Sequence, residues 1–182
     1  DLMVYFCSDE SLKSNDVATM FKSSNEWGDR DTLLEGYPNQ LLKNYSPTPS
    51  YLKWPTGLIN LGIFGELRRT KSDAVILMAW SNPTWWISII TAFMFGSPVF
   101  YMTDANVQGE ASKNKLKRWL KRLVLAGILF RIVTGFLSAG QSNRMLYRLY
   151  GVPDNKIIPF AYSWGYDKLA DMVEEQDAVR PA

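Results

Sequence analysis

Residues 73–102, DAVILMAWSNPTWWISIITAFMFGSPVFYM, decide the fold class. No charged residue occurs from Ala74 to Thr103, a length that would suit a membrane-spanning helix. The turn residues Ser81-Asn82-Pro83 and Gly96-Ser97-Pro98, however, divide the stretch into three short pieces. We therefore predict a buried strand, a helix and a second buried strand, which together form a β-α-β unit.

The same alternation continues on both sides of this unit. Further strands are predicted at residues 2–7, 135–139 and 156–160, and helices at 57–69, about 111–133 and 143–150, whereas residues 8–50 look long and irregular. Strands that alternate with helices predict an α/β fold with a doubly wound, Rossmann-like, mostly parallel sheet. We assign residues 1–167 to this domain and residues 168–182 to a helical tail or the start of an interdomain linker.

Composition excludes several classes of protein. The 182 residues carry a net charge of +2, contain one cysteine and contain no histidine. A Ser-His-Asp hydrolase, a Cys-His enzyme and a histidine-ligated zinc site are therefore excluded within these residues. Cys7 lies in an apolar run and is interpreted as a core residue, and we expect no metal site because there is no acidic cluster or CxxC pair.

Ligands of parallel sheets bind beyond the carboxyl ends of the strands. The residues predicted at these ends are polar and aromatic, which suits a ligand rich in hydroxyl groups, such as a sugar. The candidate ligand-binding residues are Trp80, Ser81 and Asn82 after one strand, Thr103, Asp104 and Asn106 after the next, and Gln141 and Ser142 after a third.

Each of these candidates also has an ordinary structural interpretation. Asp104 could orient an acceptor hydroxyl as a catalytic residue, or it could simply belong to a turn. Trp80 could stack on a sugar or pack in the core. Gln141 and Ser142 could face a phosphate at a helix N-terminus or cap that helix.

A basic segment from Lys113 to Arg122 precedes an apolar run. Leu116, Trp119, Leu120 and Leu123 form one helical stripe beside its charges. Such a helix suits the surface of an anionic membrane, although a solvated surface helix with its stripe in the core is the alternative. Nucleic acid is not expected as a partner, because no base-reading motif accompanies the charges. The candidate membrane-binding residues are Lys113, Lys115, Lys117, Arg118, Trp119, Lys121 and Arg122.

The order of these segments resembles the N-terminal domain of glycosyltransferase family four, the retaining enzymes of the GT-B architecture. The segments that carry the resemblance are DAVILMAW, PVFYMTD, FLSAGQSN and, most specifically, the turn GVPDNKI at residues 151–157. The stretch from Trp27 to Asn44 is similar to an acceptor-side loop of bacterial polysaccharide members, and there Glu35 and Tyr37 are further acceptor-binding candidates. The family's first strand, its usual Asp after the last strand and its donor-binding domain have no counterpart in these residues.

The resemblance implies the acceptor-binding half of a retaining sugar transferase that is inactive without its donor domain. Its implied donor is a UDP- or GDP-sugar, without a metal ion, and this domain itself would bind no cofactor. The implied acceptor is a polyprenyl-diphosphate-linked saccharide at the cytoplasmic face of a bacterial membrane, in O-antigen, capsule or exopolysaccharide synthesis. Two alternatives stay open at this point: a soluble GT-B enzyme such as a nucleotide-sugar epimerase, and a non-catalytic flavodoxin-like binding module.

Overall fold

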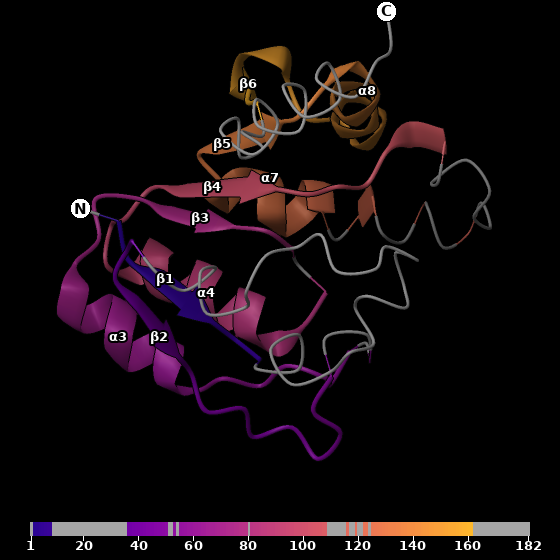
Figure 1. Cartoon of the computed structure of the whole chain (residues 1–182). Helices are drawn as coiled ribbons and strands as arrows, with labels where there is room; N and C mark the ends of the chain where they lie inside the picture. The colour runs from indigo at the N-terminus through magenta and orange to yellow at the C-terminus, as the bar shows by residue number, and fades with distance from the viewer. Residues whose placement is uncertain are drawn as a thin grey trace, which may run out of the picture.

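A computed structural model describes residues 2–8, 36–50, 53, 55–79, 81–108, 116, 119, 122–123 and 125–161. Its main sheet contains four parallel strands in the order of the chain. These are β3 (Val75–Leu77), β4 (Val99–Met102), β5 (Gly135–Ser138) and β6 (Ile157–Pro159). Figure 1 shows them one above the other, from β3 near the middle to β6 at the top.

The connections between these strands place the helices on one face of the sheet. The connecting elements are α4 (Pro83–Met94), the π-helix η2 (Leu125–Leu129) with α7 (Phe130–Ile132), and α8 (Gln141–Tyr150). Parallel strands that follow one another in sequence order, joined by right-handed crossovers, put every connecting helix on the same side.

The hydrophobic core agrees with this one-sided arrangement. Leu77, Tyr101, Phe136 and Ile157 are register partners across all four strands, and all are buried. They join Ile89 of α4, Leu129 of η2 and Tyr147 of α8 in one cluster. The Phe136 ring lies edge-on to its aromatic neighbours, with centroid distances of 5.1 Å to Phe130 and 5.3 Å to Tyr147. Such pairs contribute about 0.5–1.5 kcal/mol each beyond the area that they bury.

A second, two-stranded parallel sheet pairs β1 (Val4–Phe6) with β2 (Asn39–Leu41). The prediction that residues 8–50 are irregular is therefore wrong for β2. The segment NQL has none of the β-branched or aromatic residues that mark a strand in sequence. It forms a strand because β1 pairs with it.

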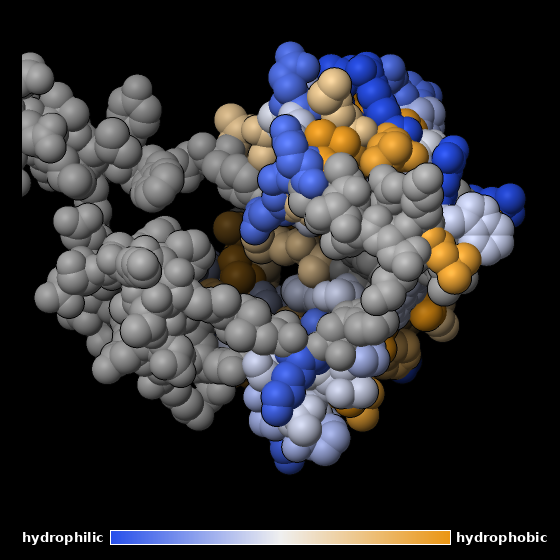
Figure 2. Space-filling view, turned by 90° about the vertical axis from the view of Figure 1, so that its right-hand side faces the viewer, coloured by the Kyte–Doolittle hydropathy of each residue, from blue (hydrophilic) through white to orange (hydrophobic). Residues whose placement is uncertain are grey.

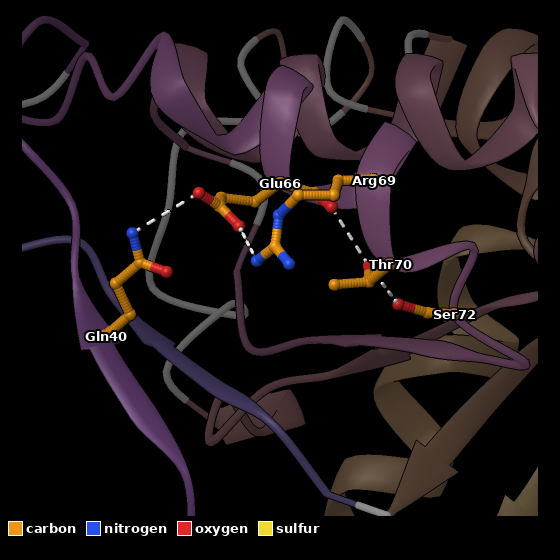
Figure 3. Close-up of polar contacts among 5 residues, drawn as sticks. All are labelled: Gln40, Glu66, Arg69, Thr70 and Ser72. Atoms are coloured by element: carbon orange, nitrogen blue, oxygen red, sulfur yellow. Dashed lines mark hydrogen bonds and ion pairs between the residues drawn. The ribbon is translucent and has the colours of Figure 1, made fainter.

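Helix α3 (Gly62–Thr70) begins later than the predicted residue 57. Residues 57–61 instead lie outside the helix and follow a turn in which the Gly57 amide donates to the Lys53 carbonyl at 2.6 Å. A Cβ at Gly57 would lie 1.8 Å from the Ser50 carbonyl oxygen, so only glycine fits there. Figure 3 shows how the helix is tied to β2: Glu66 accepts hydrogen bonds from Gln40 at 3.3 Å and from Arg69 at 2.6 Å. Arg69 and Gln40 hold the pKa of the Glu66 carboxyl below its usual range, against a smaller opposing effect of desolvation.

Asn60 joins the two-stranded sheet to α4 from a fully buried position. Its amide nitrogen donates to the carbonyls of Cys7, Leu42 and Lys43 at 3.0–3.1 Å, and its side-chain oxygen accepts from the Thr84 hydroxyl at 2.8 Å. One side chain thus links the residues that follow β1 and β2 to the first turn of α4.

The turn GVPDNKI closes the C-terminal end of the helical layer. Gly151 ends α8 in the left-handed conformation at φ 93°, as expected of a glycine just after a helix. Arg148 donates to both carboxylate oxygens of Asp154, at 2.7 and 2.9 Å. The Lys156 ammonium donates to the carbonyls of Phe130 and Val133, at 2.9 Å each, and so caps the end of α7. The motif GVPDNKI therefore has a structural role: it connects α8 to β6, and Lys156 binds it to α7.

The α/β class and the parallel sheet are confirmed. The doubly wound arrangement stays a prediction, because every described crossover between β3 and β6 lies on one face. Among the described residues, no helix is both long enough and apolar enough to cross a bilayer.

Candidate functional site

The candidate site lies at the carboxyl ends of β4 and β5. In Figure 1 the strands run from left to right, so Figure 2, which views the right-hand side, looks onto these ends. The centre of that face is hollowed. Thr103, Asp104 and Asn106 follow β4 there, and Gln141 and Ser142 follow β5. Two of the three sets of strand-end candidates thus lie at the ends of paired strands.

Asn143 fixes the geometry of this site. Its amide nitrogen donates to the carbonyls of Thr103 at 3.0 Å and Ala105 at 2.7 Å. The Thr103 hydroxyl closes the turn by accepting from the Ala105 amide at 3.2 Å. Asp104 lies between the two anchored residues, and its side chain is exposed. The loop therefore presents a carboxylate to solvent from a backbone that is held on both sides.

Helix α8 begins against the same loop. The prediction that Gln141 or Ser142 caps this helix is wrong, since Gly140 occupies the N-cap position and no side chain caps the helix. The Ser142 hydroxyl instead donates to the side-chain oxygen of Gln108, which occupies a helical position just after the β4 loop. The uncapped amides of the first turn remain a favourable environment for an anion.

A small cavity of about 40 Å³ lies beneath the loop. It is lined by residues of β4, β5, η2 and α8, among which are Leu125 and Leu129, and by Thr103 and Ala105 of the loop. This volume would hold only a few water molecules. Burial raises the pKa of Tyr101, which lines the cavity, although a hydrogen bond with Thr103 opposes the shift. Tyr101 is therefore a neutral support of the loop and not a base.

The residues after β3 contribute less to the site than predicted from the strand pattern. Asn82 is 3% exposed and occupies the N-cap of α4, where its carbonyl accepts from the Trp85 amide at 3.1 Å. Its side-chain oxygen is buried without a hydrogen-bond partner among the described residues. Ser81 is half-buried beside it, and Trp80 lies outside the described residues.

Of the two candidates from the acceptor-side loop, Tyr37 is not brought to the site. Tyr37 lies two residues before β2, at the amino end of that strand, where its carbonyl accepts from the Asn39 side chain at 3.2 Å. Glu35 lies outside the described residues.

The basic segment is described at four helical positions, 116, 119, 122 and 123. The apolar stripe faces outward there: Leu116 is 69% exposed, Trp119 58% and Leu123 50%. At these three positions the exposure contradicts the alternative in which the stripe packs into the core, and Leu120 lies outside the described residues. Arg122 is also exposed, whereas Lys113, Lys115, Lys117, Arg118 and Lys121 lie outside the described residues.

Asn143 and Gln108 belong to the site but were not predicted. Asn143 stands directly after the predicted pair Gln141 and Ser142. Its position in the first turn of a helix that follows a strand is a signal that could have identified it. A short amide side chain at such a position can form hydrogen bonds with neighbouring backbone groups.

Among the described residues, no group of three or more acidic, cysteine or histidine side chains is arranged to hold a metal ion. No protein-family model, curated protein or solved structure matches this chain. The functional hypothesis therefore depends on the geometry of the site and on the resemblance of the sequence motifs to those of glycosyltransferase family four.

Proposed function

We propose that this chain is the acceptor-binding domain of a retaining glycosyltransferase of GT-B architecture. The acceptor is a saccharide on a polyprenyl-diphosphate carrier at the cytoplasmic face of a bacterial membrane, and the donor is a nucleotide-sugar held by a partner domain. The product belongs to the synthesis of a surface polysaccharide. The enzyme works peripherally on the membrane, and this domain contributes no cofactor.

The observation that carries the proposal is the position of the outward-facing stripe of Leu116, Trp119 and Leu123. This stripe comes eight residues after Gln108, which just follows the loop that presents Asp104. Exposed Trp and Leu beside a run of Lys and Arg have the chemistry of an interfacial helix on anionic lipid. A lipid-linked acceptor requires this combination, because its sugar must reach the site while its tail stays in the bilayer.

The polar rim supports a sugar as the ligand. Asp104 offers acceptor oxygens for sugar hydroxyls, and Thr103 and Asn106 stand on the same anchored loop. The α8 N-terminus provides partial positive charge for a phosphate group near Gln141 and Ser142. Asp104 would orient the acceptor hydroxyl, and Asn143 would position Asp104 through the loop backbone.

Binding to nanodiscs tests the proposal. The probe is an anionic nanodisc that contains a mixture of undecaprenyl-diphosphate-linked mono- to tetrasaccharides, and the reference is the same disc with undecaprenyl phosphate alone. We expect tighter binding to the saccharide disc and the loss of this preference in Asp104→Asn. Equal binding to both discs would contradict a saccharide acceptor.

The membrane part is tested separately by flotation with vesicles. Binding to anionic vesicles should decrease with salt and disappear when Lys117, Arg118, Lys121 and Arg122 are changed to Glu in a protein that stays folded. Absence of binding at low salt would favour a soluble GT-B enzyme.

A further inference from the structure

Helix α4 has an apolar outer face that no other described element covers. Its inner residues Ile89 and Ala92 are buried, while Ile90 is 51% exposed and Phe93 and Met94 are 63% exposed each. The whole helix is uncharged. A helix that is hydrophobic all round is normally covered on every side. Exposed apolar side chains gathered on one helix face therefore indicate a contact with something outside the described structure.

The apolar surface continues onto α3. The Phe64 ring lies 6.2 Å from the Phe95 ring, centroid to centroid, which joins the outer side of α3 to the end of α4. The α3–α4 patch consists of Leu61, Phe64, Ile90, Phe93, Met94 and Phe95, each at least 41% exposed.

The patch lies on the helical layer that also carries the basic segment. The crossover from β3 to β4 contains α4, and the crossover from β4 to β5 contains the described helical positions 116, 119, 122 and 123 together with η2. Consecutive right-handed crossovers are neighbours on one face of the sheet, so the outward sides of both helices point the same way. Figure 2 shows hydrophobic residues at several places along the right-hand margin of the carboxyl-end face. One flat surface could therefore touch both the patch and the exposed stripe around Trp119.

Charge selects among the possible occupants. Arg68 lies one helical turn after Phe64 on the outer side of α3, and Lys71 follows at the end of that helix; both are exposed. In a two-fold contact between copies of this chain, Arg68 and Lys71 of both copies would meet around one apolar centre. An anionic bilayer instead complements them and the basic segment.

We propose that the α3–α4 patch is a second membrane contact, which inserts its apolar side chains into the acyl boundary of an anionic bilayer. The proposal extends the membrane association proposed above. The basic segment supplies attraction that salt screens, and the patch supplies burial of apolar surface that salt leaves intact. With both in place, the helical layer lies on the leaflet and the carboxyl ends of the strands open along the membrane surface, where the head of a lipid-linked saccharide lies.

The test is flotation with vesicles of three parts phosphatidylcholine and one part phosphatidylglycerol, at 0.05 M and 0.5 M NaCl. We expect the unmodified protein to retain a bound fraction at high salt. The double substitution Phe93→Ser with Met94→Ser should bind at low salt and lose at least about tenfold in partitioning at high salt. The matched control is Ile76→Ser with Met78→Ser. Both residues are 55% exposed, and they alternate along the chain with Val75 and Leu77, which are buried in the core. Ile76 and Met78 therefore lie on the face of the sheet opposite the helices.

A labelled variant provides a readout of depth. Phe93→Cys can be labelled with an environment-sensitive dye, since burial raises the pKa of Cys7 to about 11 and leaves little reactive thiolate there. We expect the dye emission to shift to the blue on anionic vesicles, whereas a dye at Ile76→Cys should not respond.

Three outcomes would overturn the proposal. The Phe93 and Met94 variant could float like the unmodified protein at high salt. The dye at position 93 could stay unresponsive while the basic segment alone accounts for binding, in which case the proposed function stands and this inference does not. Light scattering could show that the unmodified protein is a dimer without lipid and the variant a monomer, which would assign the patch to a second copy of the chain.

Discussion

Asn143→Asp tests whether the β4 loop depends on one amide side chain. The substitution keeps the shape of the side chain but replaces a donor by an acceptor. Two hydrogen bonds, at 3.0 and 2.7 Å, are lost, and a carboxylate is placed against the carbonyl oxygens of Thr103 and Ala105. Each lost bond costs about 1 kcal/mol, and the buried carboxylate adds at least about 1 kcal/mol more. We therefore expect a loss of about 3 kcal/mol in the free energy of unfolding at pH 7.5.

The helix dipole alone would predict that Asn143→Asp raises the free energy of unfolding. An acidic residue in the first turn of a helix interacts favourably with its dipole, by about 0.3–1 kcal/mol. Gln141→Glu is the matched control, because it adds the same charge to the first turn of α8 from an exposed position. That variant should be neutral or slightly stabilised.

Urea unfolding followed by circular dichroism measures both variants. The environment of the new carboxyl raises its pKa in the folded state, so its cost is full at neutral pH and decreases as the pH falls and the group becomes protonated. Asn143→Asp should therefore approach the stability of Asn143→Ala near pH 4. Amide exchange of residues 103–108 should accelerate in both variants. If Asn143→Asp is as stable as Gln141→Glu at pH 7.5, the account of the loop is wrong.

Three further predictions concern the scaffold. Asn60→Ala should lower the free energy of unfolding by about 3–5 kcal/mol in urea unfolding, because the Thr84 hydroxyl and three carbonyls lose a buried partner; a loss below about 1 kcal/mol would contradict its linking role. Lys156→Met should cost about 1–2 kcal/mol in the same assay, since the carbonyls of Phe130 and Val133 lose their donor, and an unchanged midpoint would refute the cap. Cys7 should react with iodoacetamide at pH 8.5 roughly a hundredfold more slowly than a free thiol, because burial raises its pKa from 9.0 to about 11. The folded protein thus keeps a proton that the unfolded chain releases, so the contribution of Cys7 to stability falls as the pH rises from 9 towards 11, and Cys7→Ala should show a smaller alkaline loss.

The sequence pattern predicted the central architecture because the strands of the main sheet are marked strongly. The two strands and the helix of residues 73–102 lie where apolar runs alternate with Pro- and Gly-containing turns. The short helix before Gly151 also ends at the predicted glycine. These signals are local, and no distant contact overrides them.

The errors arose where distant contacts decide the local structure. The strand β2 has no strand-forming residues and depends on β1 for its hydrogen bonds. The start of α3 is displaced by the close approach of Gly57 to Ser50 and by the buried role of Asn60. Neither interaction is visible from spacing alone.

The sequence predicted the candidate ligand-binding residues but not Asn143, the residue that holds their loop in place. The strand pattern predicted that Asp104 and Ser142 follow strand ends. The pairing of β4 with β5 in the structure makes these two ends neighbours. The role of Asn143 depends on a backbone turn of the β4 loop that the sequence does not specify. The alternative that buried the stripe of Leu116, Trp119 and Leu123 was settled only by the exposure of these side chains.

The most direct test of the central claim is mass spectrometry of lipid-linked saccharides in cells that produce the protein and in cells that lack its gene. The proposed function predicts that loss of the gene causes a polyprenyl-diphosphate saccharide to accumulate that is one sugar shorter than its product. Restoration by the unmodified gene, and not by a gene with Asp104→Asn, would place the acceptor site on the loop after β4. An unchanged pool of lipid-linked saccharides in the deletion strain would contradict the assignment as a sugar transferase acting on a lipid-linked acceptor.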